Sequence, residues 1–128
     1  MNSKLKVNYN PGTDKMTLES DEAIITTSLD NIIVVANSIP YTFTFKCIEQ
    51  TYKVENIKND FNDFVTEIGF LKIQSNYAIN PQKITAYRRK TLEIEINNDL
   101  IFPVETKYRK KIIDFIKGID HNLNYFSV

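Results

Sequence analysis

Residues 70–80 read Phe-Leu-Lys-Ile-Gln-Ser-Asn-Tyr-Ala-Ile-Asn, and this stretch decides the fold of the 128-residue chain. The segment at 70–73, apolar except for Lys72, has the pattern of a strand, a polar loop follows at 74–76, and apolar residues return before Asn80. Because the residue before a proline is pushed out of the helical region, a turn is expected at 80–82. The stretch therefore predicts extended structure that presents a polar loop.

A three-stranded meander is predicted after this stretch, with strands at 84–87, 91–96 and 100–104. The middle strand alternates between apolar and polar residues, so Leu92, Ile94 and Ile96 are expected to point inward. Between the first two strands lies the basic turn Arg88-Arg89-Lys90, whose charges suit a hairpin tip in solvent.

A helix is predicted at 107–117, with Thr106 as its N-cap and Gly118 at its end. Its apolar stripe consists of Tyr108, Ile112, Ile113 and Ile116. Its first turns carry four cations, which oppose the helix dipole: Lys107, Arg109, Lys110 and Lys111. That arrangement is favourable if a phosphate is bound there, because helix N-termini and basic side chains both attract phosphate.

An earlier helix is predicted at 57–68, with Asn56 as its N-cap and Gly69 at its end. One continuous apolar stripe runs along it: Ile57, Phe61, Phe64, Val65 and Ile68. A helix with one apolar face of this kind is expected to cover a sheet.

The N-terminal half is predicted to be β structure, with strands at 4–9, 15–19, 23–27, 32–36, 41–45 and 50–54. The Pro11-Gly12 turn joins the first two strands into a hairpin. The unbroken apolar run at 32–36 indicates a strand covered on both faces, and 50–54 is expected to pair with 41–45. Together with the two helices, these elements predict a mainly β domain with two short helices.

The composition predicts one folded domain in the cytoplasm. Hydrophobic residues make up 42% and charged residues 25% of the chain, which allows a core without disulfides or metal. The longest apolar run, 32–36, is far shorter than the roughly 20 residues of a membrane-spanning helix. The polar N-terminus has no signal-peptide core. The single cysteine, Cys47, is expected to be a buried, inert thiol.

The net charge is zero, but the two halves of the chain differ in sign. Residues 1–69 contain six lysines and ten acidic residues, a net of −4, whereas residues 70–128 contain ten basic and six acidic residues, a net of +4. Such an asymmetry can place a basic face on an otherwise acidic protein. The charge permits nucleic-acid binding without requiring it.

Motifs for catalysis are not found in the sequence, and no enzyme activity, metal or cofactor is expected. The single histidine, His121, has no cysteine or second histidine at ligand spacing. The sequence contains neither a phosphate-binding glycine loop nor a nucleophile elbow. Glu93 and Glu95 share one strand face and are interpreted as its solvent side rather than as a catalytic pair.

From about Ser28 to Ile116, the order and spacing of these parts resemble the LytTR family, a β-rich DNA-binding module found in many bacterial transcription regulators. The residues that carry the resemblance are Asp30-Asn31-Ile32-Ile33, the helix at 57–68, the stretch 70–80, the hairpin at 84–104 and the Pro103-Val104 step into a basic helix. The resemblance implies elongated antiparallel β-sheets whose loops enter successive major grooves on one side of DNA. No receiver domain is expected in this chain, so the regulator would act alone.

The resemblance also implies three contact loops, at 37–41, at 74–76 and after Pro103-Val104. The residues that it assigns to DNA binding are Lys72, Gln74, Ser75, Asn76, Thr106, Lys107, Arg109 and Lys110. Family members have serine and arginine where this chain has Glu105 and Thr106. Arginine bonds guanine in two places, which threonine cannot do. Gln74 and Asn76 retain amide groups that suit adenine.

These observations lead to a proposed organisation and two functions. Residues 1–27 are expected to form a β-hairpin extension, 28–118 the LytTR-like domain and 119–128 a tail. The first function is a sequence-specific transcription regulator that binds double-stranded DNA, as a homodimer on repeated half-sites, with no membrane or small-molecule partner. The alternative is a LytTR-fold module that has lost DNA contact and binds protein, which Glu105 and the zero net charge favour.

Overall fold

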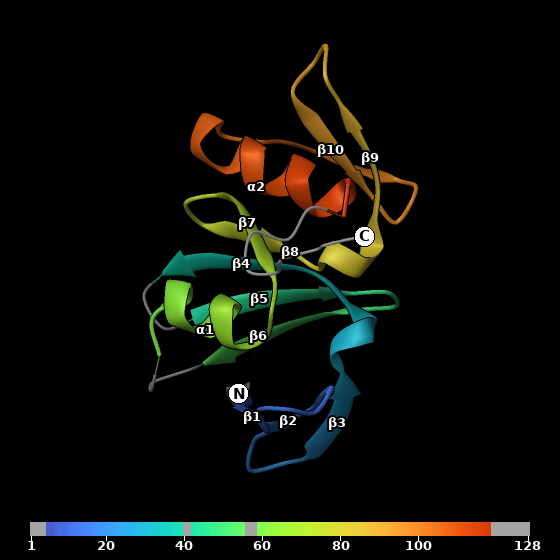
Figure 1. Cartoon of the computed structure of the whole chain (residues 1–128). Coiled ribbons are helices and arrows are strands. Elements are labelled where there is room, and N and C mark those ends of the chain that lie inside the picture. Colours follow the sequence, from blue (N-terminus) through green and yellow to red (C-terminus); the bar gives the residue numbers. More distant parts are fainter. Residues whose placement is uncertain (1–4, 40–41, 56–58, 119–128) are drawn as a thin grey trace.

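The computed structural model describes residues 5–39, 42–55 and 59–118, in which strands dominate and two α-helices occur (Figure 1). The strands and α-helices are β1 (Leu5–Tyr9), β2 (Lys15–Glu19), β3 (Ile24–Ser28), β4 (Ile32–Ile39), β5 (Thr42–Cys47), β6 (Thr51–Glu55), α1 (Phe61–Glu67), β7 (Leu71–Gln74), β8 (Tyr77–Ile79), β9 (Ile84–Arg88), β10 (Glu93–Ile96), β11 (Leu100–Pro103) and α2 (Thr106–Ile116), with short 3-10 helices at η1 (Leu29–Asn31) and η2 (Pro81–Lys83). The predicted mainly β class with two short helices is confirmed.

The strands form two sheets that follow one another along an elongated molecule (Figure 1). The larger sheet has the order β3-β2-β1-β6-β5-β4-β8-β7, and the smaller has the order β11-β10-β9. The predicted hairpin β1–β2, the pairing of β5 with β6 and the meander β9–β11 are all antiparallel and confirmed. The sequence did not predict that β1 would pair with β6 in parallel, or that β4 would pair with β8.

Helix α1 covers the larger sheet through aromatic side chains. The Phe64 ring lies 5.1 Å from the Phe43 ring and 5.8 Å from the Phe45 ring between centroids, and all three side chains are buried. The predicted helix start is wrong: α1 begins at Phe61 because the side chain of Asp60 accepts a hydrogen bond from the Asp63 amide at 2.8 Å. The expected cap, Asn56, lies outside the described residues.

The buried side chains form two clusters, one under α1 and a second between α2 and strands β7 and β10. Helix α2 packs on this second cluster. Ile112 is buried there with Ile73, Ile94 and Val104. Part of the predicted stripe is wrong, since Ile113 is half-buried, Ile116 is 45% exposed, and neither joins the cluster. Ile116 is the last residue of the helix, one turn beyond Ile112, which is the last side chain of α2 in the cluster.

The start of α2 and the turn before β10 also differ from expectation. Glu105, not Thr106, is the N-cap of α2, and its side chain makes no capping hydrogen bond. Leu92 was expected to point inward but is 38% exposed. The hairpin turn extends through this residue, which has a left-handed φ of 59° and donates its amide to the Arg88 carbonyl at 2.8 Å. Ile94 and Ile96 are fully buried, as predicted.

Asn80, directly after β8, connects this strand to the start of the neighbouring strand β4. Its side-chain amide donates to the carbonyls of Leu29 and Ile32 at 3.0 and 2.9 Å, and its carbonyl oxygen accepts from the Gln82 amide at 3.0 Å. The side chain is buried, so each polar atom requires these partners. Asn80 thereby fixes β8 against the start of β4.

Cys47 is buried in the core under α1, as predicted. Burial raises the pKa of its thiol to about 11, because the thiolate would lose its hydration there. No helix in the described part of the chain is long and apolar enough to cross a membrane.

Candidate nucleic-acid interface

Three segments that lie far apart in the sequence meet at one flank of the molecule. They are the end of β4 (37–38), the β7–β8 turn (75–76) and the segment from the end of β11 into α2 (103–107), which we call together the loop edge (Figure 1). Residues 40–41, which complete the first predicted contact loop, lie outside the described residues. The described parts of all three predicted contact loops therefore lie side by side.

Hydrogen bonds hold these three segments together. The Asn37 amide donates to the Asn76 carbonyl at 2.9 Å, which joins the first segment to the second. The Glu105 amide donates to the Ile73 carbonyl, also at 2.9 Å, which joins the third segment to β7. Ile73 and Val104 are buried beneath this connection. The loop edge is thus supported by a packed core and is not a set of independent loops.

The β7–β8 turn presents two exposed polar side chains. Ser75 and Asn76 occupy the turn, and Gln74 and Tyr77 pair at its base. The Gln74 side-chain amide donates to the Pro103 carbonyl at 3.0 Å, so one of its two N–H groups connects the second and third segments. Ser75 and Asn76 are therefore the exposed members of the predicted group 74–76, whereas Gln74 is half-buried.

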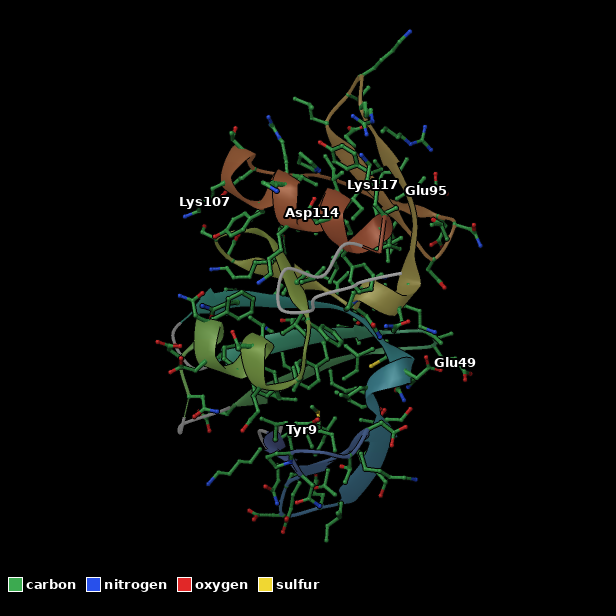
Figure 2. The ribbon with its side chains drawn as sticks, in the orientation of Figure 1. Tyr9, Glu49, Glu95, Lys107, Asp114 and Lys117 are labelled. Carbon is green, nitrogen blue, oxygen red and sulfur yellow. The ribbon has the colours of Figure 1, made fainter. Side chains whose placement is uncertain are left out.

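Two lysines gather over one aromatic ring at the loop edge. The ammonium nitrogens of Lys72 and Lys107 lie 5.5 and 5.2 Å from the centroid of the Tyr108 ring. The Lys72 ammonium also donates to the Asn62 side chain of α1 and lies 5.8 Å from the Phe61 ring. The two ammonium groups thus share one aromatic ring through cation–π contacts, and within the described residues neither forms an ion pair. Figure 2 shows Lys107 at the loop-edge end of α2 and Lys117 at the opposite end.

The other predicted cations of α2 have different environments. Arg109 is half-buried and turns back toward the loop edge, where its Nε donates to the Val104 carbonyl at 2.8 Å. Lys110 forms an ion pair with Asp114 one turn later, at 2.9 Å, and its side chain remains 79% exposed. Arg109 thus helps to shape the third segment, whereas part of the charge of Lys110 is offset by Asp114.

The first turn of α2 is open to an anion. Glu105 caps the helix without a side-chain hydrogen bond, and no acidic residue lies in the first turn. Glu105 and Thr106 are both exposed. Backbone N–H groups at a helix start attract anions, but the Glu105 carboxylate beside them opposes an approaching phosphate.

Two contributors to this site were not identified from the sequence. Asn62 was not assigned to it because ten residues separate it from Lys72 and only the packing of α1 brings them together. Tyr108 was interpreted as part of an apolar stripe, although its neighbour Lys107 in the sequence was a usable signal for a ring–cation contact. Within the described residues, no group of histidine, cysteine and acidic side chains could hold a metal ion.

Comparison with known proteins finds similarity at the level of the fold. No family model matches the sequence, and no curated protein is significantly similar to it. The structure resembles the LytTr DNA-binding domain of a Bacillus cereus protein described as a methyl-accepting/DNA response regulator, with a TM-score of 0.64 and 15% sequence identity. The match covers 84% of this chain and 100% of that domain. The chain therefore has a LytTR-like fold, in which extended antiparallel sheets are combined with two short helices.

Proposed function

We propose that the protein binds double-stranded DNA through the loop edge and acts as a sequence-specific transcription regulator in the cytoplasm. The observation that carries the proposal is the convergence of the three predicted contact segments, with Lys72 and Lys107 held beside them. The structural similarity supports it, since the similar structure is a DNA-binding domain. The function is a binding function, without catalysis or a cofactor.

The parts of the site have distinct roles in this proposal. Lys72 and Lys107 neutralise backbone phosphates. A lysine that has no ion pair to break can replace a counterion condensed on the DNA, and the release of that counterion favours binding. Ser75 and Asn76 enter a groove, where the amide of Asn76 reads a base edge and adenine is the base that an amide fits best. Thr106, Arg109 and Lys110 contact the flanking backbone, and Gln74 aligns the second and third segments.

The organisation of the chain follows the same proposal. In this proposal residues 28–118 are the LytTR-like unit and residues 1–27 are an addition to it, in which β1, β2 and most of β3 extend the larger sheet. Two copies act on repeated half-sites, each copy using one loop edge.

A second function, protein binding by a module that has lost DNA contact, is favoured by one observation. Glu105 places a carboxylate at the exposed start of α2, beside the path proposed for phosphate. Selection of duplexes from a random-sequence library by the purified full chain distinguishes the two functions. The DNA proposal predicts enrichment of a common motif and retardation of that duplex at low salt. If no duplex is enriched or retarded, the protein-binding function replaces it.

A further inference from the structure

The two ends of the elongated molecule are turns of opposite charge. The β2–β3 turn forms one end, and the β9–β10 turn forms the other (Figure 1). We call residues 20–24 the acidic tip and residues 88–92 the basic tip. The loop edge lies on the flank between them (Figure 1). A partner that contacts either tip therefore leaves the loop edge accessible.

The acidic tip presents two carboxylates beside an exposed apolar side chain. Asp21 and Glu22 are exposed, and Ile24 is 67% exposed at the start of the edge strand β3. The turn is ordered by hydrogen bonds from the Ser20 amide to the Ala23 carbonyl at 2.9 Å and from the Glu22 amide to the Ser20 hydroxyl at 3.2 Å. The two carboxylates are thus held on a defined turn.

The basic tip presents the complementary set. Arg88 is paired with Glu95, whose pKa is lowered by hydrogen bonds from Arg88 and Thr85, so this pair is already satisfied. Arg89 and Lys90 are exposed, and within the described part of the chain neither forms an ion pair. Leu92 is 38% exposed beside them. Within the described residues, each tip therefore presents two charges outside ion pairs and one large exposed apolar side chain.

We propose that the basic tip of one copy docks on the acidic tip of a second copy, so that molecules associate head to tail. The occupant is a second copy because the chain itself supplies both surfaces, with equal numbers of opposite charges and an exposed Ile24 to meet an exposed Leu92. A contact between two different surfaces is heterologous and can repeat along a row of copies. Two tips bury little surface, so the association is weak and transient.

Sedimentation velocity of the full chain without DNA tests the contact, since the proposal does not require DNA binding. The weight-average sedimentation coefficient should rise from micromolar to millimolar protein at low salt. Raising the ionic strength from about 0.01 M to about 1 M shortens the Debye length from about 30 Å to about 3 Å and should suppress the rise. A coefficient that does not increase with concentration at low salt overturns the proposal.

Charge reversal identifies the surfaces involved. Asp21→Lys with Glu22→Lys, or Arg89→Glu with Lys90→Glu, should each weaken association at least about tenfold, because like charges then face each other. An equimolar mixture of the two variants should associate, since each reversed tip meets a complementary tip of the other variant. The matched control, Lys53→Glu on β6, should associate like the unchanged chain.

Two kinds of outcome would contradict the proposed contact between the tips. If both reversals leave self-association unchanged, or if the mixture associates no better than either variant alone, the tips do not meet. If Arg89→Glu with Lys90→Glu weakens binding to a duplex with a single site while self-association is unchanged, the basic tip contacts DNA. Circular dichroism of each variant excludes unfolding as the cause.

Discussion

The core under α1 and the loop edge are built on different principles. In the core, the Phe64 ring lies within 6 Å of the Phe43 and Phe45 rings, and the three buried side chains belong to one contiguous cluster that excludes water. At the loop edge, single hydrogen bonds such as Asn37–Asn76 and Gln74–Pro103 join segments whose side chains are largely exposed. The core stabilises the fold by burying apolar surface area. The loop edge instead arranges functional groups through a few directional hydrogen bonds.

This difference separates stability from binding. Burying an aromatic side chain contributes several kcal/mol, whereas a typical hydrogen bond contributes about 1 kcal/mol. Substitutions in the core should therefore lower the free energy of unfolding. Substitutions of exposed side chains at the loop edge should instead change affinity for DNA and leave unfolding nearly unchanged.

The largest expected effect is on the core. Replacing Phe64 by alanine should lower the free energy of unfolding by about 3–5 kcal/mol, because it removes a ring packed between α1 and the sheet and leaves a cavity. Urea denaturation followed by circular dichroism measures the change. Phe115→Ala, at a position 40% exposed, is the control and should change it by less than about 0.5 kcal/mol. A loss below about 1 kcal/mol for Phe64→Ala would contradict the packing.

The pH dependence of the same core gives a smaller effect. Because the folded pKa of Cys47 is about 11 and its ordinary value is 9.0, the unfolded chain loses its thiol proton first. The stabilising contribution is thus complete below pH 9.0 and decreases as the pH rises toward 11. Between these two pH values, the free energy of unfolding of the unchanged protein should fall by about 2 kcal/mol more than that of Cys47→Ala, since each pKa unit corresponds to about 1.4 kcal/mol.

The measurement is urea denaturation of both proteins at a series of alkaline pH values, with the difference between them plotted. Titration of lysines and tyrosines affects both proteins alike and cancels in that difference. A difference that stays constant from neutral to alkaline pH would show that the thiol ionises as readily in the folded protein as in the unfolded chain.

The sequence predicts the core region well because its signals are local. The alternation of Phe43 and Phe45 and the helical spacing of Phe61, Phe64 and Val65 each fix one face of one element. The start of α1 was missed because the prediction placed its N-cap at Asn56, whereas the hydrogen bond from the Asp63 amide identifies Asp60, four residues later, as the cap. Leu92 was placed inward because a period of two cannot reveal that a residue has entered the turn.

The loop edge was predictable only in part. The resemblance to the LytTR family identified its three segments. That they lie side by side depends on contacts between distant residues, such as the pairing of β4 with β8 and the hydrogen bond from Gln74 to Pro103. Arg109 and Lys110 were equivalent in sequence, yet one bonds a backbone carbonyl and the other a carboxylate. No local pattern distinguishes these two environments, because each depends on the path of the chain around the helix start.

A double substitution at the start of α2 tests whether the loop edge contacts DNA, because it should raise the affinity for DNA. Glu105→Ser with Thr106→Arg removes a carboxylate and adds a cation at two exposed positions. A bidentate arginine–guanine contact contributes about 1–3 kcal/mol, so affinity should rise at least about tenfold on duplexes with guanine at the contacted position. Fluorescence anisotropy with matched guanine and adenine duplexes measures the selectivity. Equal affinity for every duplex, with the fold retained, would show that this segment faces away from DNA.

The salt dependence of duplex binding tests the central claim, that the loop edge contacts DNA phosphates, most directly. Each phosphate contact contributes about −0.9 to the slope of log affinity against log salt. If Lys72 and Lys107 each neutralise one phosphate, Lys72→Gln with Lys107→Gln should make the slope shallower by about 2. Lys15→Gln with Lys53→Gln, two exposed lysines on β2 and β6, should leave it unchanged. Equal slopes for the two double variants would contradict the claim.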